Sequence, residues 1–423
     1  MPKSLRIFVL VLSVGVVLTA FVGANANRVS AASDPQEGAY RQMQVYSEVL
    51  RHVQSDYVED PNMNSVTTGA LRGLLETLDG NSSYLNAAEY KAYKEQMGSD
   101  HKSAHAQVGL NMAKRYGYAT VVSVVPDGPA EKAGLMDGDL LESIADRSTR
   151  DLSLATVQSL LQGEPGTKVT VSVVRPRKAT PERITLTRAN LSLPATLETF
   201  YEQASILYVK PESLDKEHVQ QVEQKLKQMS RTNTKKILLD LRDVSTGDTS
   251  EALRLANFFI KTGTLATLEG QKVQKQVFTA DANKAVNAIA PMVTLVNRGT
   301  SGPAELVAAA LLDSKRSELV GEKTFGDASQ QKTFELPDGA ALILSIAKYE
   351  GPSGKKLQDE GVTPGVLVAS AAEDGTADDG DDEDDTTAKT PGAVTKPAAV
   401  QKPSAKIDDQ LSKALEMLKS KVA

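Results

Sequence analysis

The stretch Met292-Val-Thr-Leu-Val-Asn-Arg-Gly-Thr-Ser-Gly-Pro-Ala-Glu305 decides the fold of the longest part of this chain. Its apolar and β-branched start predicts a buried strand over 292–296, and the small residues that follow it predict a helix over 304–312. Pro303 favours the first helical turn, so the polar turn between the two elements ends at the head of that helix. A strand that leads into a helix in this way is typical of an α/β layer.

Strands and helices continue to alternate on both sides of this stretch. Apolar runs at 206–209 and 237–241 predict two further buried strands, and residues 216–229 predict a helix between them. Consecutive strands joined through a helix are expected to run parallel, with the helices packed on the sheet. We therefore expect an α/β core over 191–369.

Short β-branched strands replace this pattern between 105 and 190. The runs 119–125 and 169–174 predict two of these strands. Between them lie Gly128-Pro-Ala130, Ala133-Gly-Leu135, Gly138-Asp-Leu-Leu141 and a helical segment over 154–161. This order resembles a PDZ domain of the bacterial, circularly permuted type, and we expect a PDZ domain over 105–190.

The resemblance to a PDZ domain implies a peptide-binding loop at Val108, Gly109 and Leu110. A PDZ domain adds the C-terminal strand of a partner to a sheet edge and captures its carboxylate in a nest of backbone amides. Gly109 favours such binding, since a glycine leaves the loop open to backbone approach. A PDZ domain that only packs within the protein is the alternative.

The N-terminus has the pattern of an export signal. Lys3 and Arg6 precede an apolar run from Ile7 to Val22, and Ala24-Asn-Ala26 offers small residues for cleavage. At about 16 residues, the run lies between the length of a signal and that of a membrane span. We expect a cleaved signal peptide over 1–32, with an uncleaved membrane anchor as the alternative. Both place the folded part outside the cytoplasm, in the periplasm or cell envelope of a bacterium.

Three further segments complete the chain. Residues 33–104 show helical periodicity and are expected to dock or dimerise. Residues 370–406 are of low complexity and carry nine acidic residues between Glu373 and Asp385, which predicts a solvated linker. Residues 407–423 predict an amphipathic helix that docks either on the core or on a second subunit. The second alternative would make the protein a homo-oligomer.

Composition excludes several classes of function. The chain of 423 residues has no Cys, which excludes a disulfide framework, a thiolate metal site and a cysteine nucleophile. A net charge of −6 argues against a nucleic-acid partner, which needs a basic face. His101 and His105 are spaced i, i+4 without a third ligand nearby, and no phosphate-binding glycine loop occurs. We expect neither a metal nor a cofactor.

The order of the segments resembles that of the carboxyl-terminal processing peptidases, also called tail-specific proteases. Local matches between residues 40 and 368 support this: Leu78-Asp-Gly-Asn-Ser-Ser-Tyr-Leu85, Lys236-Ile-Leu-Leu-Asp-Leu-Arg242, Val320-Gly-Glu-Lys-Thr-Phe-Gly326, Tyr349-Glu-Gly-Pro-Ser-Gly354 and Gly361-Val-Thr-Pro364. The first of them is similar to the family's Leu-Asp-Pro-His-Ser-x-Tyr-Leu. The resemblance implies a multi-domain α/β fold with an inserted PDZ domain. It also implies a Ser-Lys dyad, in which a neutral lysine takes the serine proton.

Both residues of that dyad are replaced in this chain. Glu305 and Phe325-Gly326 fix the alignment without a gap, and they place Gly302 at the serine position and Asp327 at the lysine position. The two positions are still 25 residues apart, so a deletion does not explain the change. Glycine has no nucleophilic atom, and the carboxylate of Asp327 has no serine to activate.

Other parts of the family's site are partly retained. Asp313 and Gln331 stand where the resemblance places accessory polar residues. Thr246 replaces a glycine of the oxyanion region. A β-branched residue resists positive φ, so we expect a backbone amide supplied there to be misaimed.

Ser301 is an alternative nucleophile, one residue before the expected position. One step along a helix start rotates a side chain by about 100°, which turns this hydroxyl away from the family's line of attack. Lys323 and Lys332 have the wrong spacing for the family's base. We therefore expect Ser301 to act as an N-cap.

These observations predict a peptidase homologue that has lost hydrolysis. We expect it to bind unfolded tails or protein C-termini through the PDZ domain and the old substrate tunnel, as an adaptor, a holdase or a partner of an active paralogous protease. The first alternative is an active serine endopeptidase that uses Ser301 with a nonstandard base. The second is a structural envelope protein that oligomerises through its terminal helices.

Overall fold

The computed structural model describes residues 35–98, 106–115, 117–175, 180–201, 205–229, 234–370 and 408–421. The chain divides into two compact units, residues 1–69 and 70–423. The expected signal peptide, the pair His101 and His105, and the acidic stretch between Glu373 and Asp385 lie outside the described residues.

The first unit contains helix α2 (Pro35–Asp56) and the start of α3 (Met63–Glu76). Both helices form where the sequence predicts helices. Glu48 pairs with Arg51 at 2.6 Å along α2, and His52 pairs with Asp56 at 2.5 Å. Within the described ranges, no helix is both long and apolar enough to cross a bilayer.

A six-stranded sheet forms the centre of the second unit. Its order is β17-β14-β13-β10-β9-β8, and all neighbouring strands are parallel except β8 and β9. The strands are β8 (Leu197–Tyr201), β9 (Ile206–Lys210), β10 (Lys236–Asp240), β13 (Met292–Val296), β14 (Glu318–Gly321) and β17 (Val366–Leu367). The expected strand at 292–296 is confirmed. It is buried along its whole length, as a parallel strand covered on both faces must be.

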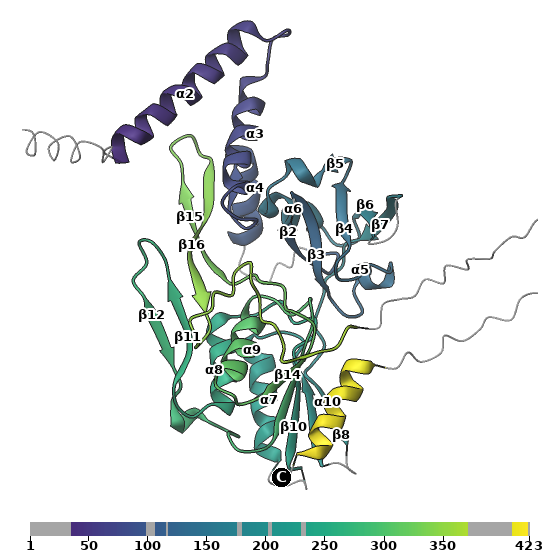
Figure 1. Ribbon diagram of the computed structural model, residues 1–423. Coiled ribbons are helices and arrows are strands. Elements are labelled where there is room, and N and C mark those ends of the chain that lie inside the picture. Colours follow the sequence, from purple (N-terminus) through teal and green to yellow (C-terminus); the bar gives the residue numbers. More distant parts are fainter. Residues whose placement is uncertain are drawn as a thin grey trace, which may run out of the picture. The chain divides into compact units, whose positions relative to one another are not determined.

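Helices cover both faces of this sheet (Figure 1). Helices α7 (Lys216–Gln228), α8 (Thr249–Phe259) and α9 (Pro303–Asp313) pack on one face, and α10 (Asp409–Ser420) packs on the other. Side chains alternate along each strand, so Leu239 packs toward α7–α9 and Leu238 toward α10. The C-terminal amphipathic helix thus docks on the core through Ala414 and Leu418, which are fully buried.

A second sheet supplies two hairpins. Its order is β1-β16-β11-β12, with β15 on the opposite edge of β16. The strands are β1 (Ser83–Leu85), β11 (Thr264–Glu269), β12 (Gln276–Thr279), β15 (Ser329–Glu335) and β16 (Ala341–Glu350), and helix α4 (Ala87–Gly98) follows β1. Through β1, the turn at 79–82 comes beside the loop that precedes β15.

The third sheet has the order β2-β3-β4-β6-β7, with β5 paired to β4. The elements are β2 (Leu110–Arg115), β3 (Tyr118–Val124), α5 (Pro129–Lys132), β4 (Leu140–Ile144), β5 (Arg147–Ser148), η1 (Thr149–Asp151), α6 (Leu154–Leu161), β6 (Lys168–Val174) and β7 (Glu182–Thr187). The strands expected at 119–125 and 169–174 are confirmed to within one residue. Strand β2 lies at the edge of this sheet, where a PDZ domain would add a peptide strand.

Candidate functional site

The turn between β13 and α9 places Gly302 at the N-cap of α9, with φ 57° and ψ −120°. Asn297 holds the start of the turn, since its Oδ1 accepts from Asp243 N at 3.0 Å. Farther along, Ser301 N donates to Val244 O at 3.0 Å. The turn is thereby tied to the loop after β10, and a glycine supplies the positive φ at its last residue.

Space for a side chain remains at Gly302. A Cβ built there would lie 3.5 Å from Asp327 O and 3.9 Å from Ser245 O, which are ordinary contact distances. Only the positive φ opposes a larger residue, so Gly302→Ala is expected to lower the free energy of unfolding by about 1–3 kcal/mol, measured by urea denaturation. Gly354, with φ 82° and open surroundings, is the control and is expected to lose a similar amount on conversion to alanine. A loss above about 4 kcal/mol at Gly302 alone would contradict the available space.

Glu305 joins the two segments that carry the altered positions. Its carboxylate is fully buried in the first turn of α9. Oε2 accepts from Gly302 N at 3.0 Å and from Asp327 N at 2.8 Å. Oε1 accepts from Gly326 N at 2.7 Å and from the Thr324 hydroxyl. Burial raises the pKa of Glu305 to about 7, and these donated hydrogen bonds oppose the rise by favouring the carboxylate.

Asp327, at the lysine position, is half-buried and engaged by an amide. Asn81 Nδ2 donates to Asp327 Oδ1 at 2.5 Å. Asn81 stands where the family resemblance places a histidine, so both partners of this contact depart from the family's pattern. Burial raises the pKa of Asp327, and the Asp359 and Asp79 carboxylates add to the rise, whereas the Asn81 hydrogen bond opposes it. The position therefore holds an acid that an amide fixes in place.

A cluster of polar side chains surrounds this contact. We call Asp79, Asn81, Ser82, Ser329 and Ser345 the Asn81 cluster. Asp79 Oδ1 accepts from Ser82 N at 2.6 Å and from Ser345 Oγ at 3.3 Å. Ser329 Oγ accepts from Asn81 Nδ2 and from Ser345 Oγ, both at 3.3 Å. The cluster connects the turn before β1 to both strands of the β15–β16 hairpin.

The two expected accessory residues lie in different places. Gln331 Nε2 donates to Asn81 O at 2.9 Å, so Gln331 joins the site. Asp313 is the last residue of α9, about 15 Å from its first turn by helical rise. Its Oδ2 accepts from Ser353 N at 2.9 Å, so Asp313 fixes the loop after β16 rather than the turn at Gly302.

Ser301 lies one residue before the N-cap, so the expected N-cap role is wrong by one position. Ser301 is 3% exposed. Among the lysines that the structure describes, none hydrogen-bonds its hydroxyl. Lys323 and Lys332 are both exposed, and Lys332 Nζ lies 5.2 Å from the centre of the Phe334 ring. The described part of the site thus offers Ser301 no amine as a base.

The loop that carries Thr246 is held by the segment before α7. Thr246 O accepts from Leu214 N at 2.9 Å, and Thr246 itself does not adopt positive φ. The positive φ angles in this loop belong to Asp243, at 65°, and Gly247, at 129°. A Cβ on Gly247 would lie 2.4 Å from the Leu214 carbonyl carbon, so close packing requires glycine there. The expected conflict between Thr246 and positive φ does not occur in this structure.

The expected peptide-binding loop is buried within the second unit. Val108 is 1% exposed, and Leu110 begins β2. Gly109 has φ 83°, and a Cβ there would lie 3.2 Å from Leu191 Cδ1 and 3.3 Å from Val125 Cβ. The glycine serves this close packing with Leu191 and Val125. Peptide binding at the loop stays a prediction.

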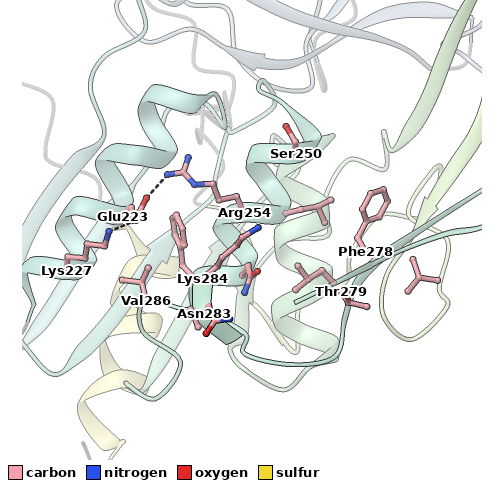
Figure 2. A pocket seen from close by; sticks show the side chains of 15 residues that line it. Glu223, Lys227, Ser250, Arg254, Phe278, Thr279, Asn283, Lys284 and Val286 are labelled. Atoms are coloured by element: carbon pink, nitrogen blue, oxygen red, sulfur yellow. Dashed lines mark hydrogen bonds and ion pairs between the residues drawn. The ribbon is translucent and has the colours of Figure 1, made fainter. Parts of the chain in front are cut away.

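Two cavities lie apart from the turn at Gly302. One, of about 970 Å³, lies among α7, α8, β12 and η3 (Ala282–Lys284), and none of the expected site residues lines it. There Glu223 pairs with both Lys227 and Arg254 at 2.5 Å (Figure 2). The other, of about 870 Å³, lies between the two hairpins and is lined by Ser345 of the Asn81 cluster. Of these two cavities, the second is the one that borders the Asn81 cluster.

Two parts of the chain match known domain families. Residues 205–368 match peptidase family S41, and residues 120–175 match the PDZ domain. The chain carries a family S41 peptidase domain. The expected relationship to carboxyl-terminal processing peptidases and the expected multi-domain α/β fold are thereby confirmed. No group of three or more histidine, aspartate or glutamate side chains in the described ranges is placed to hold a metal ion.

The relatives are processing proteases. The chain is 28% identical over 326 residues to carboxyl-terminal-processing peptidase 2, chloroplastic, of Arabidopsis thaliana, a match of 72% of this chain and 61% of the relative. It is 27% identical over 374 residues to the carboxy-terminal processing protease CtpA of Bacillus subtilis, covering 86% and 78%. The structure of the photosystem II D1 C-terminal processing protease has the same fold, with a TM-score of 0.65, 24% identity and coverage of 77% and 92%.

Two features of the site were not anticipated from the sequence. Glu305 follows Gly302 by three residues, which is the capping-box spacing, so the sequence did contain a signal for its role. Asn81 is 246 residues from Asp327, and no spacing rule connects them. The contact depends on the pairing of β1 and β15 with β16, which brings distant segments together.

Proposed function

We propose that this protein is a carboxyl-terminal processing peptidase homologue that does not hydrolyse peptides and that binds unfolded tails or protein C-termini. The turn at Gly302 carries the proposal. Its positive φ, its hydrogen bond to Glu305 and its room for a side chain are present, and the hydroxyl is absent. A serine peptidase needs an oxygen nucleophile at this point.

The surroundings of Gly302 support the same proposal. Asp327 replaces the basic amine and is held by Asn81. Ser301 is buried and has no lysine beside it among the described residues. Acyl transfer requires a nucleophile within hydrogen-bond reach of a base, and neither residue meets that condition.

Binding without cleavage is supported by the cavity between the hairpins. It is lined by residues 344–348 of β16, and Ser345 among them belongs to the Asn81 cluster. Val108 and Gly109 are buried, and Leu191 packs close to Gly109, so the expected PDZ loop is less accessible than the hairpin cavity. We assign the first contact with a tail to the hairpin cavity and a second contact to the PDZ domain.

An unstructured, fluorescently labelled tail incubated with the full chain is expected to bind and to stay intact. A serine-directed fluorophosphonate is expected to leave the protein unlabelled, because Gly302 offers no hydroxyl. The measurements are fluorescence anisotropy for binding and mass spectrometry for cleavage and labelling. Ser301→Ala is the control and is expected to behave as the parent chain does. Cleavage or labelling that disappears in Ser301→Ala would establish the alternative, a peptidase that uses Ser301.

We further propose that the protein acts outside the cytoplasm, as an adaptor, a holdase or a partner of an active paralogous protease. The N-terminal pattern of Lys3, Arg6 and the apolar run to Val22 supports export. Protease added to intact cells with a permeabilised outer layer is expected to degrade the protein. Protection from that protease would place it in the cytoplasm and contradict the proposal.

A further inference from the structure

A groove of about 870 Å³ lies between the β11–β12 and β15–β16 hairpins, which are neighbours through the pairing of β11 with β16 (Figure 1). We call it the lysine groove, because Lys272, Lys332, Lys348 and Lys356 line it. These lysines come from the segment after β11, from β15, from β16 and from the loop after β16. Four separate segments therefore bring a cation to one cavity.

The lysine groove carries an excess of positive charge, although the whole chain has a net charge of −6. Its lining includes two acids, Glu269 and Glu350, and Glu269 pairs with Lys275 at 3.1 Å. Of the four lysines, Lys348 pairs with an acid outside the lining, at 3.2 Å. The other three form no ion pair with any residue that the structure describes. Their charges are free to attract an acidic ligand.

The floor of the groove suits an extended chain. Strand β16 pairs with β1 through 341–343 and with β11 through 348–350. Residues 344–347, between these two ladders, line the groove, and Leu344 and Ile346 supply apolar surface together with Phe334. An extended peptide on this floor places its alternate side chains on opposite sides, so one set can meet Leu344, Ile346 and Phe334.

The groove borders the Asn81 cluster. Ser345 lines the groove, and its hydroxyl donates to Ser329 Oγ at 3.3 Å. Asn81 donates to Ser329 at 3.3 Å and to Asp327 at 2.5 Å. The groove is therefore connected to Asp327 through the side chains of Ser345, Ser329 and Asn81.

We propose that the lysine groove binds extended peptide tails rich in aspartate and glutamate. The inference rests on the proposed tail-binding function and adds the chemical class of the tail. Acidic side chains meet the unpaired lysines on the walls, and apolar side chains between them meet Leu344 and Ile346 on the floor. Because Lys272, Lys332 and Lys356 are exposed, the attraction is screened by salt.

Labelled tails that differ only in charge test the proposal. One alternates glutamate with alanine and valine, and the second has glutamine in place of each glutamate. The full chain is expected to bind the acidic tail at least about tenfold more tightly at low salt, a preference that high salt reduces. The triple variant Lys272→Glu, Lys332→Glu, Lys356→Glu is expected to lose the preference.

The control triple variant carries Lys261→Glu, Lys284→Glu and Lys315→Glu. These exposed lysines lie outside the groove and give the same change in net charge. It is expected to keep the preference, with thermal unfolding of both triple variants as a check of folding. Equal affinity for both tails, or an equal loss in the control, would overturn the charge preference and leave the proposed function standing. If neither tail binds, both the charge preference and the proposed tail-binding function are overturned. Cleavage of a bound acidic tail would overturn only the proposed loss of hydrolysis.

Discussion

Replacing Arg242 with methionine is expected to lower the free energy of unfolding by about 3–5 kcal/mol. Arg242 follows β10 and donates from Nη2 to Asp240 Oδ2 at 2.6 Å and from Nη1 to Asp408 Oδ2 at 2.8 Å. Asp240 is 0% exposed. Without the guanidinium, the side-chain donor that remains to Asp240 among the described residues is the Tyr208 hydroxyl at 3.0 Å. The loss in stability comes from a buried carboxylate without its counter-charge.

Urea denaturation of two further variants isolates that cause. Asp408→Asn removes the exposed partner but keeps an N-cap for α10, where Asp408 Oδ1 accepts from Leu411 N at 2.9 Å. Its expected loss is below about 1 kcal/mol. Adding Asp240→Asn to Arg242→Met is expected to recover part of the stability, because the buried acid becomes neutral. Equal losses in Arg242→Met and Asp408→Asn would show that the lost stability comes mainly from the docking of α10 and not from the burial of Asp240.

The parallel sheet could be predicted from the sequence, whereas the hairpin sheet could not. Strand β13 is apolar or β-branched throughout, so its type and bounds follow from composition. Strand β15 reads Ser-Gln-Gln-Lys-Thr-Phe-Glu and is exposed along most of its length. A hairpin with little buried surface carries little apolar alternation, and its pairing with β16 is a tertiary contact that periodicity does not encode.

The same division holds for the site. Motif spacing located Gly302 and Asp327, because Glu305 and the Phe325-Gly326 pair are local landmarks. The hydrogen bond from Asn81 to Asp327 joins segments that precede β1 and β15, two strands far apart in sequence that both pair with β16. The packing of Leu191 on Gly109 also joins separate segments. Both depend on tertiary contacts between segments that are distant in sequence. The family's sequence pattern therefore locates the positions of the site, whereas the contacts of their side chains follow only from the tertiary structure.

Glu305→Gln is expected to lower the free energy of unfolding by about 2–3 kcal/mol at about pH 8.5, where the carboxylate is ionised because this pH is above its pKa of about 7. Each carboxylate oxygen accepts two hydrogen bonds. A glutamine has one acceptor oxygen, so in either orientation its NH₂ group faces two of the donors. At least one buried backbone N–H is then left without an acceptor, because only the Thr324 hydroxyl can turn to accept from the NH₂ group. The desolvation of that N–H is the cost.

Hydrogen exchange tests where the loss occurs. The amides of Gly326 and Asp327 are expected to lose protection in Glu305→Gln, because both donate to this carboxylate. Glu318→Gln is the control. Its side chain is 56% exposed and pairs with Lys421 at 2.8 Å, so it is expected to cost less than about 1 kcal/mol and to leave those amides protected. An equal, small effect in both variants would mean that Glu305 does not hold the two segments together. The positive φ and the hydrogen bonds of the turn at Gly302 would then need another structural cause.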